Sequence, residues 1–181
     1  MSYVVTLSGS PSSTSRSTYL LALAENILVD RDIQCHRIDI RTLSADALIR
    51  GDATHLDIVQ AVAAFALADA VIVTTPLYKS AYSGLLKVFL DLLPRGALSG
   101  KPILPMATGG SIAHLLALDY ALRPVLCSLG AEHIIGNVYA TEQDIPQLNG
   151  QFMVNVAIQQ RITTAIAALM QAIVAPSPMA A

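Results

Sequence analysis

The chain has 181 residues, of which 54% are hydrophobic and 13% charged, and its formal net charge is −2 at pH 7. The length suits one domain with a single core, and the apolar composition excludes an intrinsically disordered chain. The near-neutral charge, with no basic stripe and no acidic tail, argues against nucleic-acid binding. We therefore expect small molecules and other subunits as partners. The apolar surplus predicts a homo-oligomer, either a dimer or a tetramer.

The sequence pattern favours neither a membrane span, nor secretion, nor a metal site. The most apolar stretch, residues 61–75, is broken by Asp69 and closed by Pro76, which leaves it short of the roughly 20 apolar residues that a spanning helix needs. No basic segment precedes an apolar core at the N-terminus, so no signal peptide and a cytoplasmic location are expected. Cys35 and Cys127 form no CxxC or Cys/His cluster, so we expect neither zinc nor a disulfide framework.

Short β-branched runs alternate with longer helical patterns, which is typical of βαβ units around a parallel sheet. In chain order, strands are expected at residues 3–8, 35–40, 70–74, 102–108 and 133–138, and helices at 16–29, 57–68, 83–93, 112–129 and 155–174. Right-handed crossovers leave few topologies, and we predict an α/β three-layer sandwich with a five-stranded parallel sheet of order 2-1-3-4-5. Residues 1–174 should form one domain, and residues 175–181 a disordered tail.

Two prolines interrupt this pattern. Pro105 would lie in a strand flanked on both sides, where a missing N–H is normally excluded, so a bulge or a ligand-facing bend is expected. Pro124 removes the N–H that would bond the carbonyl of Tyr120, so helix 112–129 must kink or bulge there, and π-bulges are frequent at functional sites. The same helix carries four leucines that we expect at a subunit interface: Leu115, Leu118, Leu122 and Leu126.

The loop after the first strand, residues 10–18 (SPSSTSRST), carries seven hydroxyl residues and one arginine ahead of a helix. Hydroxyl donors, free N–H groups, the helix dipole and a guanidinium all favour a phosphate. The loop is neither GxGxxG nor a P-loop, so a terminal phosphate monoester such as that of FMN fits better than a pyrophosphate. The alternative is a serine-rich loop with an ordinary N-cap.

Two further loops should lie beside it, because ligands bind at the carboxyl ends of the strands in such a sheet. In residues 75–84 (TPLYKSAYSG), Pro76 is expected to end the strand and leave backbone groups free for a planar heterocycle. A packing role for Tyr78 and a solvated Lys79 are the alternatives. Residues 108–111 (TGGS) let bare backbone approach a ligand, although they also fit a plain turn.

Three segments, GSPSSTSRS, TPLYKSAYSGLLKVFLDLLP and ATGGSIAHLLALDYALRPVL, resemble the motifs of NADPH-dependent FMN reductases of alkanesulfonate utilisation. The resemblance runs over about residues 1–139 and implies a flavodoxin-like fold, with FMN and NADPH as cofactors and NADH as the alternative donor. It implies that the phosphate is held by Ser10, Ser15, Arg16 and Ser17. It implies that the isoalloxazine is bordered by Pro76, Leu77, Tyr78 and Lys79, with Ser83 and Gly84 nearby, and on its other side by Thr108, Gly109, Gly110 and Ser111.

The resemblance also implies a function: reduction of FMN by NAD(P)H, and release of the reduced flavin to a separate flavin-dependent monooxygenase that cleaves alkanesulfonates for sulfur acquisition. No catalytic side chain is expected, because the cofactors carry out the hydride transfer. In this family a tyrosine inserted in the fourth helix, matching Tyr120, is thought to weaken flavin retention, and plain interface packing is the alternative.

Two other functions stay open. One is a reductase with tightly bound FMN that acts on quinones, azo dyes or metal ions. The other is a flavodoxin-type electron carrier, against which the near-neutral charge counts.

Overall fold

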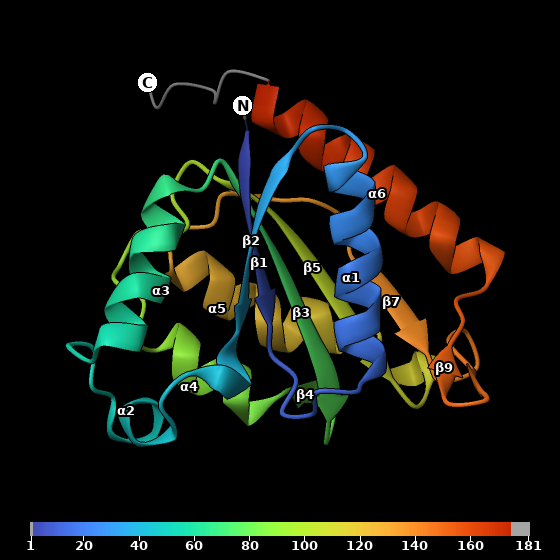
Figure 1. Ribbon diagram of the computed structural model, residues 1–181, viewed down its shortest axis with the longest axis horizontal. Coiled ribbons are helices and arrows are strands. Elements are labelled where there is room, and N and C mark those ends of the chain that lie inside the picture. The colour runs from blue at the N-terminus through green and yellow to red at the C-terminus, as the bar shows by residue number, and fades with distance from the viewer. Residues whose placement is uncertain (1, 175–181) are drawn as a thin grey trace.

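The computed structural model describes residues 2–174, so the tail expected at 175–181 lies outside the described part of the chain. Its centre is a twisted sheet with helices on both faces (Figure 1). The sheet runs in the order β2-β1-β3-β5-β6, with β7 also on β5 and β4 on β3. Its strands are β1 (Tyr3–Ser8), β2 (Gln34–Asp39), β3 (Ala70–Tyr78), β4 (Ala81–Tyr82), β5 (Pro102–Gly109), β6 (His133–Ile134) and β7 (Val138–Thr141). All neighbouring pairs in this sheet are parallel except β3–β4. The order of the parallel strands confirms the predicted order.

Two helices cover one face of the sheet, α1 (Arg16–Val29) and α6 (Val156–Val174), and three others cover the opposite face (Figure 1). These are α3 (Leu56–Leu67), α4 (Gly84–Leu90) and α5 (Arg123–Ser128). Elements absent from the prediction are strand β4, the short turn η1 (Ile40–Thr42), helix α2 (Ala45–Arg50), and the hairpin of β8 (Gln147–Leu148) and β9 (Gln151–Phe152). None of the helices within residues 2–174 has the length and apolar character needed to cross a bilayer.

Alternation along β1 divides the core into two halves. Val4 packs with α1 and α6, whereas Val5 and Leu7 pack with α3, α4 and α5. Because successive side chains of a strand point to opposite faces, one strand supplies both layers. In β3, residues 70–76 are all buried, as expected for a central parallel strand.

The structure corrects the two expectations about prolines in strands. β3 does not end at Pro76 but runs on to Tyr78. Gly9 N donates to Thr74 O, so Thr74 and Pro76 face β1, whose ladder with β3 ends at Thr74. The missing N–H of Pro76 therefore faces no strand, which is where proline is tolerated.

Pro105 follows the same rule. No bulge lies on its β3 side, because β5 pairs with β3 without interruption from Ile103 to Thr108. Ile135 N donates to Ile103 O, so Ile103 and Pro105 face the edge strand. That strand is split there: β6 ends at Ile134 and β7 begins at Val138. The single fifth strand expected at 133–138 was therefore wrong, and the break lies in the neighbour of Pro105 rather than in its own strand.

The fourth helix is irregular, as Pro124 predicted. A 3-10 turn, η2 (Ile112–His114), precedes a π-helical turn, η3 (Leu118–Leu122), which leads into α5. Arg123 N donates to Leu118 O, five residues back, which is the π pattern. The expected leucine interface was wrong, because Leu118, Leu122 and Leu126 are buried against the sheet of their own chain and Leu115 packs beside them. The exposed apolar side chains on this segment are Ile112, Leu116 and Tyr120.

Candidate functional site

The three predicted loops follow β1, β3 and β5, which are neighbours in the sheet, so their carboxyl ends lie side by side. The eight buried polar residues of the described chain belong to these strands and the loops that follow them. They are Thr6, Ser8, Ser10, Ser17, Thr74, Thr75, Ser83 and Thr108. Buried hydroxyls need a hydrogen-bond partner to offset the loss of water, so their concentration at one sheet edge indicates a site rather than a plain core.

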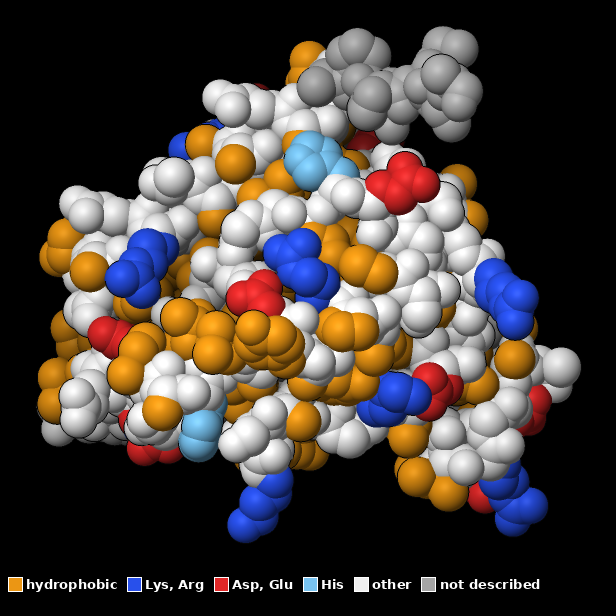
Figure 2. Space-filling view, turned by 180° about the vertical axis from the view of Figure 1, so that it is seen from behind, with side chains coloured by type: hydrophobic (Ala, Val, Ile, Leu, Met, Phe, Trp, Pro, Cys, Tyr) orange, Lys and Arg blue, Asp and Glu red, His pale blue; other side chains and the backbone are white. Residues whose placement is uncertain are grey.

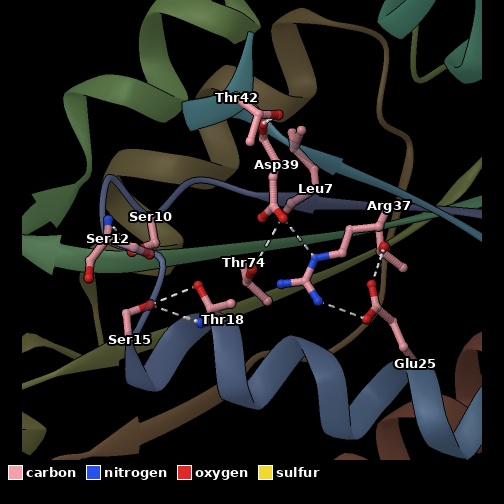
Figure 3. Close-up of polar contacts among 11 residues, drawn as sticks. Leu7, Ser10, Ser12, Ser15, Thr18, Glu25, Arg37, Asp39, Thr42 and Thr74 are labelled. Atoms are coloured by element: carbon pink, nitrogen blue, oxygen red, sulfur yellow. Dashed lines mark hydrogen bonds and ion pairs between the residues drawn. The ribbon is translucent and has the colours of Figure 1, made fainter.

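Short-range hydrogen bonds shape the loop after β1 (Figure 3). Ser10 Oγ accepts from Ser12 N at 3.2 Å, and Ser12 Oγ accepts from Thr14 N at 3.2 Å. Ser15 is the N-cap of α1, and its Oγ accepts from Thr18 N at 3.1 Å and contacts Ser17 Oγ at 3.1 Å. The loop is therefore built around the start of α1 by its own hydroxyls.

The start of α1 offers free donors to an anion. The first N–H groups of a helix have no partner within it, and the cap hydroxyl of Ser15 satisfies only that of Thr18. The first turn carries no acidic side chain. Buried Ser8, at the end of β1, adds an Oγ with no hydrogen-bond partner among residues 2–174. The dipole and the free N–H groups favour negative charge at this end of the helix.

A half-buried charged cluster of Glu25, Arg37 and Asp39 lies between α1 and the β1–β2 edge, beside this loop (Figure 3). Arg37 Nη1 lies 3.1 Å from Glu25 Oε2, and Arg37 Nε lies 3.4 Å from Asp39 Oδ2. Thr6 Oγ1 donates to Glu25 Oε1 at 2.5 Å. These groups pair with one another, so we interpret the cluster as structural support for the β1–α1 corner.

The second loop is a hairpin of β3 and β4 rather than an open segment. Lys79 and Ser80 at its tip have φ of 51° and 61°. Positive φ at both central residues is the conformation that matches a tight hairpin to the strand twist, although Asn and Gly adopt it more readily than Lys and Ser. The hairpin holds the side chain of Tyr78 out from the sheet edge, 51% exposed, and leaves Lys79 exposed beside it.

Ser83 ties the second loop to the first. Its Oγ donates to Gly9 O at 2.5 Å and accepts from Leu86 N at 3.1 Å, so it also caps α4. Ser83 N donates to Thr75 Oγ1 at 3.0 Å. Gly9 fits this junction because it has no side chain, since a Cβ there would lie 2.9 Å from Leu86 Cβ. Gly84 follows Ser83 as the first residue of α4 and is exposed.

The third loop is held by Tyr139 of β7. Its hydroxyl donates to Ser111 O at 2.6 Å. A Cβ on Gly109 would collide with that hydroxyl and lie 3.5 Å from Leu77 Cβ, so Gly109 is packed between β7 and the second loop. Burial, with a smaller effect from the Asp144 carboxylate, raises the pKa of Tyr139 above its ordinary value. The phenol therefore stays protonated as a donor.

The structure brings the backbones of all fourteen predicted site residues to this edge, but it directs one side chain away from the expected role. Arg16 Nε donates to Ile145 O at 2.9 Å, and the guanidinium lies 5.6 Å from the ring centroid of Phe152. Tyr120 is 78% exposed on η3, and β4 packs against η3, so Tyr120 belongs to the element beside the second loop.

Sequence reasoning missed Gly9, Tyr139 and Thr75 as organisers of the site. Gly9 sits at the strand-to-loop junction in the GSPS segment, which was a usable signal. Tyr139 had none, because it lies about thirty residues beyond the loop that it supports.

Two other surface hollows lie away from the three loops. One, of about 500 Å³, lies between α6 and residues 135–137, and the other, of about 420 Å³, lies between β2 and α3. Neither is lined by a residue of the three loops. Neither hollow therefore belongs to the candidate site, which is recognised by its buried hydroxyls and its three adjacent loops.

Comparison with known proteins agrees with this geometry. A family model described as NADPH-dependent FMN reductase matches residues 2–145. The chain is 39% identical over 170 residues to "FMN reductase (NADPH)" of Escherichia coli K12, covering 94% of this chain and 89% of that one. It is 44% identical over 149 residues to a protein of the same name from Pseudomonas putida KT2440, covering 81% and 75% of the two chains. It is also 36% identical over 144 residues to the "NADH-dependent FMN reductase SfnF" of Pseudomonas fluorescens Pf0-1, covering 78% and 77%.

Solved structures show the same relationship. The apo form of an NADH:FMN oxidoreductase (EMOB) superposes with a TM-score of 0.87 at 40% identity, covering 98% of this chain and 92% of the other. A flavodoxin from Streptococcus pneumoniae TIGR4, at 14% identity, TM-score 0.62 and coverage of 94% and 99%, shares the fold alone. The family model matches most of this chain, and this flavodoxin-like chain therefore belongs to the NADPH-dependent FMN reductase family.

Proposed function

We propose that the protein is an NAD(P)H-dependent FMN reductase that releases reduced FMN to a flavin-dependent monooxygenase acting on alkanesulfonates. The observation that carries the proposal is the close approach of three loops from adjacent strands, in a chain of this family. Ser83 Oγ donates to Gly9 O, and a Cβ on Gly109 would lie 3.5 Å from Leu77 Cβ. Loops that lie together form one site. A flavin has a phosphate at one end and a flat ring at the other, and the first loop suits the phosphate whereas the second and third suit the ring.

The first loop fits a phosphate monoester. Its donors are the free N–H groups at the start of α1, and the first turn of α1 has no acidic residue. The hydroxyls of Ser10, Ser15 and Ser17 lie beside them; those of Ser10 and Ser15 donate to Ser12 O and Thr18 Oγ1 within the loop and would turn toward a bound phosphate. The charge of Arg16 at the first helical position adds to this field. Ser8 Oγ, at the end of β1, is buried and has no hydrogen-bond partner among residues 2–174, so it is available to a ligand bound between β1 and α1.

The second and third loops fit a flat ring. A Cβ on Gly109 would lie 3.5 Å from Leu77 Cβ, a Cβ on Gly110 would have no atom within 4 Å, and Tyr78 is exposed at the end of β3. The residues that would border the ring are Pro76, Leu77, Tyr78, Lys79, Ser83, Gly84, Thr108, Gly109, Gly110 and Ser111. Bound there, FMN supplies the hydride acceptor, and the protein's task is to orient the flavin and the nicotinamide and to exclude water.

Release of the flavin is the part of the proposal that draws on the family resemblance and on the π turn. The names of several relatives are those of FMN reductases, both NADPH- and NADH-dependent, so either nicotinamide is a candidate donor. Tyr120 lies on the π turn η3, and η3 packs against β4. We propose that it weakens flavin retention there, as the family resemblance implies.

The exposed apolar face of η2 and η3 supports a homo-oligomer. Seen from behind the view of Figure 1, apolar side chains gather in a band across the middle of the molecule (Figure 2). Ile112, Leu116 and Tyr120 are four residues apart and are all more than half exposed. We propose that this face, defined by those three residues, packs against a second copy in a dimer or tetramer.

The test is NADPH oxidation by the full chain stripped of flavin, followed by its absorbance at 340 nm. Turnover that rises with added free FMN, far beyond one equivalent, is the expected result. Turnover that needs a quinone and only the flavin already bound would favour a prosthetic-FMN reductase instead. Absence of NADPH and NADH oxidation at every FMN concentration would refute the reductase function and leave an electron carrier.

A further inference from the structure

Within residues 2–174 the Arg16 side chain makes one hydrogen bond, one cation–π contact and one ion pair, and all three are with the segment after β7. Its Nε donates to Ile145 O at 2.9 Å, its guanidinium lies over the ring of Phe152, and its Nη1 lies 3.7 Å from Glu142 Oε1. With Nε taken by a carbonyl, only the Nη groups remain for an anion, and one of them faces a carboxylate. Glu142 therefore stands where it competes for the donors that a phosphate would use.

The segment that carries Glu142 is well ordered by its own hydrogen bonds. Asp144 Oδ2 accepts from both Thr141 N and Thr141 Oγ1 at 2.8 Å, and Asp144 Oδ1 accepts from Asn155 Nδ2 at 2.8 Å. Burial alone would raise the pKa of Asp144, but these hydrogen bonds outweigh it and hold the pKa below its ordinary value. The backbone of Glu142 is thus fixed between an anchored Thr141 and an anchored Asp144.

The side chain of Glu142 is nevertheless free to respond. It is 62% exposed, and at 3.7 Å its contact with Nη1 is an ion pair without a hydrogen bond. Exposed pairs of this kind contribute little to stability, so the pair can open at low cost. While the pair is closed, Glu142 weakens the attraction between Arg16 and a phosphate dianion at the start of α1. The Glu142 carboxylate also repels that dianion, because both carry negative charge.

We propose that Glu142 tunes flavin retention by competing with the phosphate of FMN for Arg16. This inference rests on the proposed function, and it assigns to Glu142 a negative effect on affinity that acts only through the phosphate. Riboflavin has no phosphate, so its affinity does not depend on this competition. The carboxylate therefore favours release of FMN without any change at the ring end of the site.

The experiment compares wild type, Glu142→Gln and a matched control, Glu132→Gln, which removes an exposed carboxylate before β6. Flavin-free full-length protein is titrated with FMN and with riboflavin by fluorescence, at low and at high salt. Glu142→Gln should lower the Kd for FMN about two- to fivefold, the range of an exposed ion pair. Riboflavin binding and the control should stay unchanged, and salt should shrink the FMN difference because it screens exposed charges.

The outcomes separate the two proposals. If wild type binds FMN and oxidises NADPH but the FMN-to-riboflavin affinity ratio is the same in Glu142→Gln, the Glu142 inference alone is overturned. Weaker FMN binding in the variant also overturns it, since Glu142 would then hold Arg16 in a phosphate-binding position. A wild-type protein that neither binds FMN nor oxidises NADPH overturns both.

Discussion

The hydroxyl of Ser83 and the carbonyl oxygen of Gly9 are joined by a 2.5 Å hydrogen bond between residues that lie 74 positions apart in the chain. The bond connects the loop after β1 to the loop after β3, and the same hydroxyl caps α4. One side chain thus fixes how the first and second loops of the candidate site lie relative to each other.

Replacing Ser83 by alanine should therefore cost both stability and flavin affinity. Loss of the cap should lower the free energy of unfolding by about 1 kcal/mol, measured by urea denaturation. Ser44→Ala is the matched control, because Ser44 caps α2 by accepting from Ala47 N and touches none of the three loops. Only Ser83→Ala should raise the Kd for FMN; equal Kd values in the two variants would contradict the role of the Ser83–Gly9 bond.

The close packing of Gly109 predicts that alanine is tolerated less well at this position than at Gly110. Gly109→Ala puts a methyl group against the Tyr139 hydroxyl and should destabilise the fold by about 1–3 kcal/mol, the usual cost of overpacking. Gly110→Ala meets nothing within 4 Å and should change stability by less than about 0.5 kcal/mol. Thermal or urea unfolding of both variants checks this.

A double variant tests the cause. Adding Tyr139→Phe to Gly109→Ala removes the oxygen that the new methyl group meets, so part of the lost stability should return. If the double variant is less stable than Gly109→Ala by the full cost of Tyr139→Phe alone, the clash is not the reason for the effect.

Local pattern was enough to predict most of the fold. The bounds of β1 and α1 agree with the expectation because an alternating run and a 3.6-residue repeat are separated by a clear N-cap at Ser15. The π turn was also predictable, since Pro124 removes a helix hydrogen bond within its own chain neighbourhood. Strand order followed from the handedness of crossovers.

The predictions that were wrong concern features that depend on residues distant in sequence. Whether a strand tolerates Pro76 or Pro105 is decided by whether a partner strand exists on the side that the missing N–H faces, and the sequence alone does not show that side. The burial of Leu118 and Leu122 was misjudged for the same reason, because the face of this segment that the sheet covers is decided by packing against strands distant in sequence. The contacts of Arg16 required the fold of residues 142–152.

Asp144 should make stability depend on pH in the acid range. Its pKa in the folded protein lies below the ordinary 3.8, so its contribution is fully present above 3.8 and is lost as pH falls through the folded value. Asp144→Asn lacks this ionisation and should be less stable than wild type at neutral pH. The gap between the two should narrow as pH falls below 3.8, measured by urea unfolding between pH 7 and 2.

Asp30→Asn serves as the control, since Asp30 is an exposed carboxylate at the end of α1. This variant leaves the bonds of Asp144 to Thr141 and Asn155 in place, so a gap that narrows below pH 3.8 only in Asp144→Asn is due to those bonds. A gap for Asp144→Asn that stays constant with pH would show that the carboxylate contributes through shape alone and not through its charge.

The exposed face of η2 and η3 makes the last prediction, which concerns assembly. Leu116 on this face and Leu148 on the β8–β9 hairpin are 56% and 55% exposed, so they present equal apolar surface in different places. If the face packs against a second copy, Leu116→Glu buries an unpaired charge in that contact and should shift the protein to a smaller species in sedimentation velocity. Leu148→Glu should leave the mass unchanged, since its surface lies outside the proposed contact. Both variants should remain folded, because neither side chain belongs to the core of its own chain. Dissociation by Leu148→Glu but not by Leu116→Glu would move the contact to the hairpin.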